Sequence, residues 1–345
     1  MEKATIVVAA FNRKQSLARC LQALSKAQYE DLSPRLIISI DRGSSNKDVR
    51  ELADQFHWKH GPKTVIYQEQ ELGLKRHILA CGELTRRYGP IILLEDDIFV
   101  SPFFYSYAGQ ACSYYRDDPR IAGISLYSPR YNETAKSAFE PLQSRHDVFF
   151  GQFPSSWGQL WTPEQWASFA AWYGDGDNLD IRSDDHHIPP NVRKWSRSWK
   201  KYFYKYMIEQ NKYFVYPYIS HSTNFADPGI HVKKPTQRYQ VTLSYCGERT
   251  YALCPLDDSG VVYDAFYEYT GLGKQFKEPV RTNLSVDLWG TKSKDAYSRF
   301  VLTTRQLNYK VLATFGSSMI PLEDNVLQNM TGDGIYLYDM QRKQR

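Results

Sequence analysis

Residues 91–97 read IILLEDD, four apolar residues followed at once by three acidic ones. A short apolar run of this kind is typical of a strand that is buried on both faces of a parallel sheet. Three adjacent carboxylates repel one another, and they are costly beside a core unless a cation neutralises them. A divalent metal that also binds diphosphate oxygens would supply that charge. The triplet alone equally allows a solvated acidic turn, so its place in the fold decides between the two.

The segment before this run alternates between apolar strands and amphipathic helices. Strands are predicted at 5–11, 35–40, 64–68 and 91–94, with helical spacing of apolar residues at 17–24, 49–56 and 72–87. This alternation predicts an α/β fold, a mostly parallel sheet with helices on both faces. Ligands of such sheets lie beyond the carboxyl ends of the strands. One sheet edge should therefore carry the polar residues that follow the strands: Asn12, Arg13, Asp41, Arg42, residues 68–71, Glu95, Asp96 and Asp97.

The pattern is more mixed after residue 101. It predicts a helix at 102–115, a strand at 121–126, a loop at 174–191, a helix at 195–210 and a strand at 214–218. Beyond about residue 235 the alternation ends, and the tail shows a strand signal at 260–263 and a helical pattern near 293–308. We therefore predict a first domain over 1–240 and a C-terminal α+β extension over 241–345.

The overall composition narrows the classes of function. The chain has 345 residues and a net charge of +5, without the run of basic residues that would indicate nucleic-acid binding. This weak positive bias is compatible with an anionic ligand, or with peripheral contact at an anionic membrane surface. Five cysteines without metal-type spacing, no signal-peptide pattern and no apolar run of about 20 residues predict a reduced, cytoplasmic protein.

Several well-defined motifs are absent from the sequence. No Gly-x-Gly-x-x-Gly follows the first predicted strand, and neither Gly-x-x-x-x-Gly-Lys-Ser/Thr nor Gly-x-Ser-x-Gly occurs. A dinucleotide fold is thus disfavoured, a P-loop is excluded, and a serine hydrolase of the α/β type is not expected. His186 and His187 beside Asp184 and Asp185 allow either a metal-binding cluster or a solvated polar loop.

Four segments, taken in order, resemble a known family. They read IVVAAFNR at 6–13, ISIDRG at 38–43, LKRH at 74–77 and LEDDIFVSPFF at 94–104. Together they resemble glycosyltransferases of the GT-A fold, both the family-2-like bacterial transferases and the N-acetylglucosaminyltransferase I family, over residues 4–235. The resemblance implies transfer of a sugar from a nucleotide-sugar donor, expected to be a UDP-sugar, to a saccharide acceptor. It also implies Mn²⁺ or Mg²⁺ as the cofactor.

The resemblance assigns roles by position. It implies nucleotide contacts at Arg13, Asp41 and His77, ribose and donor-sugar contacts at Glu95 and Asp96, metal ligands at Asp97 and His231, and an acceptor wall at Trp157, Trp161 and Trp195. For Asp41 a turn role is equally open, for the histidines a surface position, and for the tryptophans core packing. The cytoplasmic interpretation adds a lipid-linked acceptor in bacterial surface-polysaccharide synthesis as an expectation by analogy.

The sequence departs from the family where the catalytic base is expected. An inverting transferase needs a carboxylate to deprotonate the acceptor hydroxyl, and N-acetylglucosaminyltransferase I carries it in a Trp-Asp-Asp-Trp segment. The similar segment here, 195–199, reads WSRSW and has no aspartate. Base candidates are therefore Asp184 and Asp185, and more weakly Asp227 or His231. An inverting enzyme is expected, while a retaining or inactive one, a carbohydrate-binding protein of this fold and a sugar nucleotidyltransferase remain alternatives.

Overall fold

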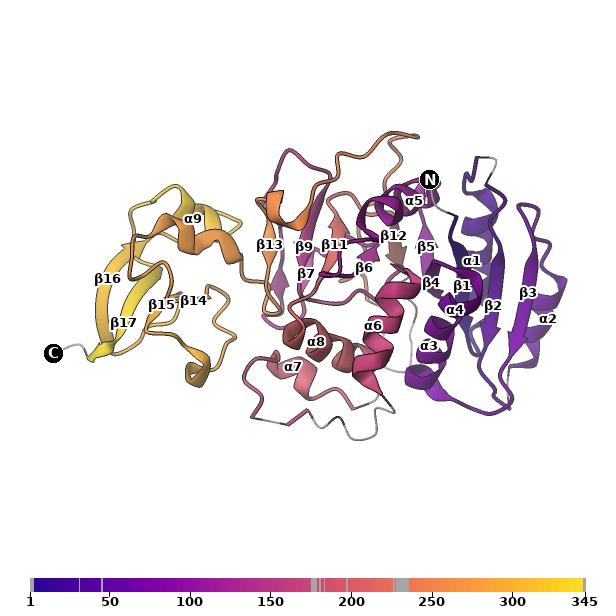
Figure 1. The fold of residues 1–345 in the computed structure, drawn as a ribbon, viewed down its shortest axis with the longest axis horizontal. Coiled ribbons are helices and arrows are strands. Elements are labelled where there is room, and N and C mark those ends of the chain that lie inside the picture. The colour runs from indigo at the N-terminus through magenta and orange to yellow at the C-terminus, as the bar shows by residue number, and fades with distance from the viewer. Residues whose placement is uncertain are drawn as a thin grey trace.

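The structure is a computed structural model, and it describes residues 3–30, 32–44, 46–174, 179, 181–182, 184–196, 198–225, 227 and 236–343. Figure 1 shows a large body of sheet and helices, with a smaller sheet beside it that is built from the C-terminal part of the chain. The predicted α/β class is confirmed, because helices cover both faces of a mixed, mostly parallel sheet.

Within the described residues, nine strands form the main sheet in the order β13-β9-β11-β6-β10-β4-β1-β2-β3. Their bounds are β1 Thr5–Ala10, β2 Leu36–Ile40, β3 Lys63–Tyr67, β4 Ile91–Glu95, β6 Ile121–Ser125, β9 Val148–Gly151, β10 Gln159–Trp161, β11 Tyr213–Pro217 and β13 Val262–Tyr263. Strands β1 to β4 pair in parallel, as predicted, because their apolar runs can be buried on both faces. Strand β10 runs antiparallel between β4 and β6 and was not predicted.

The helices divide between the two faces of this sheet according to the alternation of side chains along β1. Ile6 and Val8 share a core with α1 (Lys14–Lys26), α2 (Lys47–Gln55) and α5 (Phe104–Tyr115). Val7 and Ala9 point to the opposite core, which is covered by α3 (Gly73–Glu83), α6 (Pro163–Tyr173) and α8 (Trp199–Glu209). The one-turn helices α4 (Thr85–Tyr88) and α7 (Pro190–Arg193) lie close to these.

Two small pairs of strands lie outside the main sheet. Strand β5 (Ile98–Val100), which begins directly after the acidic triplet, pairs antiparallel with β12 (Ser222–Asn224). Strands β7 (Tyr131–Asn132) and β8 (Ser137–Ala138) form a hairpin. The pairing of β5 with β12 brings the chain after β12 next to the acidic triplet, because the Phe225 amide donates to the Asp97 carbonyl (3.0 Å).

The C-terminal part of the chain has a sheet and an apolar core of its own. Within residues 236–343, β14 (Leu284–Asp287), β15 (Phe300–Thr303), β17 (Ile335–Lys343) and β16 (Tyr309–Phe315) pair in that order, next to α9 (Glu323–Leu327). Three 3₁₀ turns lie at 256–258, 270–275 and 294–296. The helix predicted near 293–308 is wrong, because the buried run FVLT at 300–303 forms β15 instead. Strand β13 joins the main sheet at 262–263, beyond the domain boundary predicted at 240.

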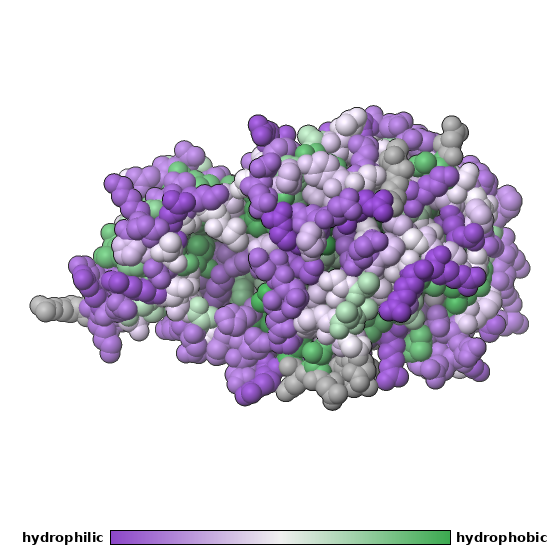
Figure 2. All heavy atoms as spheres, viewed as in Figure 1, coloured by the Kyte–Doolittle hydropathy of each residue, from purple (hydrophilic) through white to green (hydrophobic). Residues whose placement is uncertain are grey.

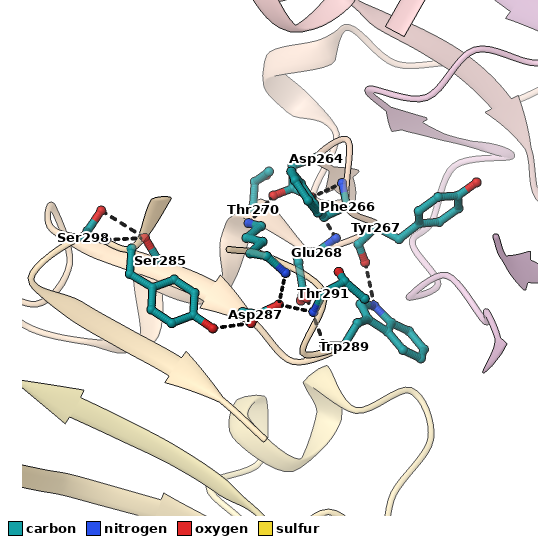
Figure 3. Close-up of polar contacts among 12 residues, drawn as sticks. Asp264, Phe266, Tyr267, Glu268, Thr270, Ser285, Asp287, Trp289, Thr291 and Ser298 are labelled. Atoms are coloured by element: carbon teal, nitrogen blue, oxygen red, sulfur yellow. Dashed lines mark hydrogen bonds and ion pairs between the residues drawn. The ribbon is translucent and has the colours of Figure 1, made fainter. Parts of the chain in front are cut away.

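A buried polar cluster links the end of β13 to the loop that follows β14 (Figure 3). Lys292 Nζ donates to Asp264 (2.6 Å), and the Trp289 amide donates to the Glu268 carboxylate (3.0 Å). Asp287 accepts the backbone N–H groups of Thr291 and Lys292 at 2.7 and 3.0 Å. These charge-assisted contacts attach the C-terminal sheet to the main body.

Among the described residues, no helix is both long enough and apolar enough to span a bilayer. Figure 2 shows one face of the molecule, on which hydrophilic residues predominate and hydrophobic ones are scattered.

Candidate functional site

The acidic triplet lies at the carboxyl end of β4, where the sequence predicted it. Glu95 is the last residue of β4 and pairs with Ala9 on the neighbouring strand β1. Arg13 follows β1 at the same edge, because the two strands run in parallel. Its guanidinium donates through Nη1 to Asp97 Oδ2 (2.7 Å) and through Nη2 to Asp96 Oδ1. The structure therefore brings together four of the predicted site residues, with Arg13 neutralising two of the carboxylates.

The charge at this edge is only partly compensated. Burial raises the pKa of Asp96 to about 6, against the opposing attraction of Arg13. Burial and the neighbouring charge of Asp97 raise the pKa of Glu95 to about 8, opposed by Arg13 and Lys200. Both shifts reflect burial first and then the closeness of the other carboxylates, and both effects disfavour the charged form of each carboxyl group.

These carboxylates fit a divalent metal whose remaining ligands are phosphate oxygens and water molecules. Among the described residues, no group of three or more His, Cys, Asp or Glu side chains converges to hold a metal. Mg²⁺, however, is commonly bound by one or two carboxylates together with phosphate oxygens and waters. Asp97, with its side chain 22% exposed, can supply such an oxygen, and the Arg13 guanidinium already occupies a cation position between Asp96 and Asp97. The second predicted ligand, His231, lies outside the described residues.

Asp41 follows β2 and holds the start of helix α3. Its Oδ1 accepts the backbone N–H groups of Arg42 and Leu72, each at 2.9 Å, and its Oδ2 accepts that of Gly73 (2.8 Å). The residue is only 4% exposed. Asp41 thus satisfies backbone donors at the N-terminus of α3, which are otherwise without partners within the helix. The alternative of a turn role fits this geometry, and contact with a nucleotide stays a prediction.

His77 lies on the face of α3 that is turned toward the sheet. It is 3% exposed, and its Nε2 lies 2.8 Å from Ser39 Oγ on β2. Gln68 Nε2 donates to the same hydroxyl (3.1 Å). Burial lowers the pKa of His77, so a neutral imidazole is favoured. The alternative of a surface position is therefore excluded, while contact with a nucleotide stays a prediction.

Trp157 lies two residues before strand β10, which pairs with β4. Gln159 at the start of β10 pairs antiparallel with Leu93 of β4 and, on its other side, with β6. The ladder to β4 ends at Gln159, and on the other side the Leu126 amide donates to the Gly158 carbonyl (2.9 Å). The ring centres of Tyr127 and Trp157 are 4.7 Å apart. Trp157 thus lies against Tyr127, and contact with an acceptor stays a prediction.

Trp195 and Trp157 are joined by a lysine that the sequence did not reveal. Lys200 Nζ, near the start of α8, lies 5.1 Å from the centre of the Trp157 ring and 5.2 Å from that of Trp195. An ammonium group is attracted to the faces of both rings. The positive charge of Lys200 also counteracts the rise in the pKa of Glu95, so Lys200 interacts both with the acidic triplet and with the aromatic wall formed by Trp157 and Trp195.

Trp161 does not belong to the predicted acceptor wall. It is 0% exposed and lies in the core, with its ring centre 5.0 Å from Trp166 and 5.7 Å from Phe203. As the last residue of β10 it is paired with Ile91 at the start of β4, far along the strand from the triplet. Its position is one of core packing, which is the alternative that the sequence left open.

The predicted base residues Asp184 and Asp185 lie in a different pocket. Asp184 is paired with Arg182 (2.9 Å) and Asp185 with Lys205 (3.5 Å). Both line a cavity of about 420 Å³ with the C-terminal residues 295–297, and the triplet is not part of that lining. A catalytic role for Asp184 or Asp185 stays a prediction without support from this geometry.

The weaker base candidate Asp227 accepts hydrogen bonds from side chains of helix α1. Its Oδ2 accepts Ser16 Oγ (2.9 Å) and the Arg19 guanidinium, and Arg19 also stacks on the Phe225 ring at 4.1 Å. These contacts hold the chain after β12 against the start of α1.

A comparison with solved structures found matches at low identity. They include S. aureus TarS 1-349 (9% identity, TM-score 0.39, 64% of this chain and 60% of that chain) and GalNAc-T7 with UDP, GalNAc and Mn²⁺ (11%, 0.45, 64% and 43%). The mannosyltransferase PcManGT from Pyrobaculum calidifontis, in complex with GDP-Man and Mn²⁺, is a third (9%, 0.37, 64% and 58%). This chain therefore covers less than two thirds of the length of each.

A comparison with curated proteins found no match. A comparison with protein families matched residues 5–106 to Glycosyl transferase family 2. That segment runs from β1 into α5 and contains Arg13, Asp41, His77 and the acidic triplet. The predicted resemblance to family-2-like glycosyltransferases is thus confirmed over residues 5–106.

Proposed function

We propose that this protein transfers a sugar from a nucleotide-sugar donor to a saccharide acceptor. The observation that carries the proposal is the cluster of Arg13, Asp96 and Asp97 at the carboxyl edge of β1 and β4. It combines a guanidinium with carboxylates that are costly without further positive charge, and it lies within the segment that matches family 2. A diphosphate bound together with a divalent metal meets both requirements.

The donor proposed is a UDP-sugar, following the resemblance of the nucleotide-binding segments. Asp97 would hold Mn²⁺ or Mg²⁺ together with the diphosphate, and the metal would supply Lewis-acid stabilisation of the leaving nucleoside diphosphate. The Arg13 guanidinium carries N–H donors that can bind two phosphate oxygens in a bidentate arrangement. Asp41 fixes the start of α3 beside this edge and so keeps the shape of the donor site.

The acceptor is proposed to lie against Trp157 and Trp195. Aromatic faces suit a sugar because its C–H groups form apolar patches, while the Lys200 ammonium between the rings offers donors to hydroxyl oxygens. An inverting reaction on a lipid-linked saccharide, in bacterial surface-polysaccharide synthesis, is the more specific form of the proposal. The mild net charge of +5 is compatible with work at an anionic membrane surface.

The experiment is a turnover assay with a panel of UDP-, GDP-, CDP- and dTDP-sugars in the presence of Mn²⁺. It measures the nucleoside diphosphate released, with and without a mixture of saccharide acceptors. Asp97→Asn should reduce release at least a hundredfold, as expected for loss of a metal ligand. Asp117→Asn is the matched control, because that carboxylate is 95% exposed and lies 3.9 Å from its neighbour Arg116. Release by none of the donors would contradict the proposal.

A second function is favoured by one observation, the absence of aspartate from the WSRSW segment at 195–199. A protein that binds a nucleotide or carbohydrate through this fold without catalysis would need no base there. It would bind one nucleotide of the panel with metal but release nothing from the corresponding sugar donor. The same assay, combined with a binding measurement, separates the two functions.

A further inference from the structure

The hairpin of β7 and β8 presents a carboxylate to the aromatic wall. Glu133 is the first residue of the turn between the two strands. The turn is firmly held, because the buried Asn132 accepts the backbone N–H groups of Thr134 (2.9 Å) and Ala135 (3.0 Å) through its side chain. Thr134 Oγ1 also donates to Asn191 of α7 (2.8 Å). The backbone at Glu133 is therefore held in place by the hydrogen bonds of this turn.

The Glu133 carboxylate reaches the same ammonium group that joins the two tryptophans. Its Oε1 lies 3.7 Å from Lys200 Nζ, and the two side chains are 17% and 12% exposed. Since Lys200 lies over both Trp157 and Trp195, the Glu133 carboxylate is next to an ammonium group that contacts both rings. A partly buried carboxylate is tolerated there because Lys200 compensates its charge.

The negative charge of Glu133 acts on two neighbouring tyrosines. Burial, followed by the charge of Glu133, raises the pKa of both Tyr127 and Tyr239. The Tyr127 hydroxyl donates to the Tyr239 carbonyl (2.9 Å), and the Tyr239 ring centre is 5.0 Å from that of Trp157. Tyr127, Tyr239 and Trp157 thus pack together beside the ion pair of Glu133 and Lys200.

We propose that Glu133 is the catalytic base of the transfer, acting on an acceptor hydroxyl bound between Trp157 and Trp195. This inference rests on the proposed function. The carboxylate takes the proton of the hydroxyl while the acceptor oxygen forms a bond to the anomeric carbon of the donor sugar. The bond from that carbon to the diphosphate breaks, and its electron pair leaves with the nucleoside diphosphate. Glu133 then returns the proton to water.

This assignment accounts for the missing aspartates of the WSRSW segment. The helix that follows the segment contributes Lys200 instead, and the carboxylate comes from a hairpin far earlier in the chain. Asp184 and Asp185 are paired with other cations and line the cavity beside residues 295–297, so they are poorly placed for the same task.

The test compares Glu133→Gln with Glu140→Gln in the full-length chain. Glu140 is the matched control, because it lies after the same hairpin, is 51% exposed and is paired with Arg130 at 2.6 Å. With the donor that wild type turns over, Glu133→Gln should lower kcat by about 10²- to 10⁴-fold, the usual contribution of a general base. Binding of the nucleoside diphosphate with Mn²⁺, measured by calorimetry, should stay within about twofold of wild type, because Glu133 acts on the acceptor.

A second variant keeps the test decisive if Glu133→Gln folds poorly. Glu133→Asp retains the charge but withdraws the carboxylate by one methylene, and it should lower kcat at least tenfold while the melting temperature stays near that of wild type. Unchanged kcat in Glu133→Gln, or equal losses in Glu133→Gln and Glu140→Gln, would overturn the role of Glu133 and leave the proposed function standing. A wild-type chain that neither binds nor turns over any donor would overturn both.

Discussion

Replacing Arg13 with methionine would remove the guanidinium that donates to both Asp96 and Asp97 but keep most of the apolar stem. The two ion pairs differ in burial, because the side chain of Asp96 is 4% exposed, whereas those of Asp97 and Arg13 are 22% and 27% exposed. Breaking a buried pair costs about 3–5 kcal/mol, and an exposed pair contributes about 0–1 kcal/mol. Because Arg13 itself is partly hydrated, we expect the free energy of unfolding to fall by about 2–4 kcal/mol.

The assay is equilibrium unfolding in urea, followed by tryptophan fluorescence. Arg86→Met is the matched control, because Arg86 is 66% exposed and pairs with the half-exposed Glu83 at 2.8 Å. It should change the free energy of unfolding by no more than about 0.5 kcal/mol. Mn²⁺ should raise the melting temperature of Arg13→Met more than that of wild type, because the cation restores the lost charge. If Arg13→Met is as stable as Arg86→Met, the triplet does not depend on Arg13 and the reasoning is refuted.

Three further predictions follow from the positions of single residues. Trp161→Ala should lower the free energy of unfolding by about 3–5 kcal/mol because it opens a cavity, whereas Trp195→Ala should instead weaken acceptor use, measured as a raised KM. Asp41→Ala should cost about 2 kcal/mol in urea unfolding, because the N-terminus of α3 loses its acceptor, and no measurable cost would contradict the capping role. Burial, with the nearby charge of Arg249, lowers the pKa of His221 to about 3, so below the unfolded value near 6.5 the unfolded chain takes up the proton and stability falls. The stability gap between wild type and His221→Gln, measured by urea unfolding at pH 7 and pH 5, should therefore narrow by about 2 kcal/mol, and a constant gap would show that His221 is not buried as a neutral ring.

Strands β1 to β4 could be predicted from the sequence because each is marked by a pattern within its own few residues. Strands β1 to β4 are apolar on both faces, so each appears as a short continuous run, and parallel pairing brings the residues after them to one edge. Arg13 and the triplet were therefore placed together correctly. Helix α6 had a usable signal as well, since Thr162 and Gln165 form a capping box around Pro163.

The surroundings of Trp157 and Trp195, the proposed acceptor wall, could be predicted only in part, because they depend on contacts between distant segments. Strand β10 has three residues and is recognised only by its partners β4 and β6. Glu133 and Lys200 carry no motif, and their pairing exists only because the β7–β8 hairpin and α8 meet at the tryptophans. Trp161 and Trp157 look alike in sequence, but Trp161, the last residue of β10, is buried in the core, whereas Trp157, two residues before β10, lies against Tyr127 and Lys200.

The central claim is that the edge at Arg13, Asp96 and Asp97 binds a nucleoside diphosphate together with a divalent metal. The direct measurement is a thermal-shift panel of UDP, GDP, CDP and dTDP, each with and without Mn²⁺, on wild type, Asp97→Asn and the exposed control Asp117→Asn. Because a ligand that binds the native state raises the melting temperature, we predict that one nucleotide, expected to be UDP, stabilises wild type and Asp117→Asn only when Mn²⁺ is present, and that Asp97→Asn loses this shift. If no nucleotide shifts wild type under either condition, or if Asp97→Asn responds as wild type does, the acidic triplet is not a metal-diphosphate site and the account is contradicted.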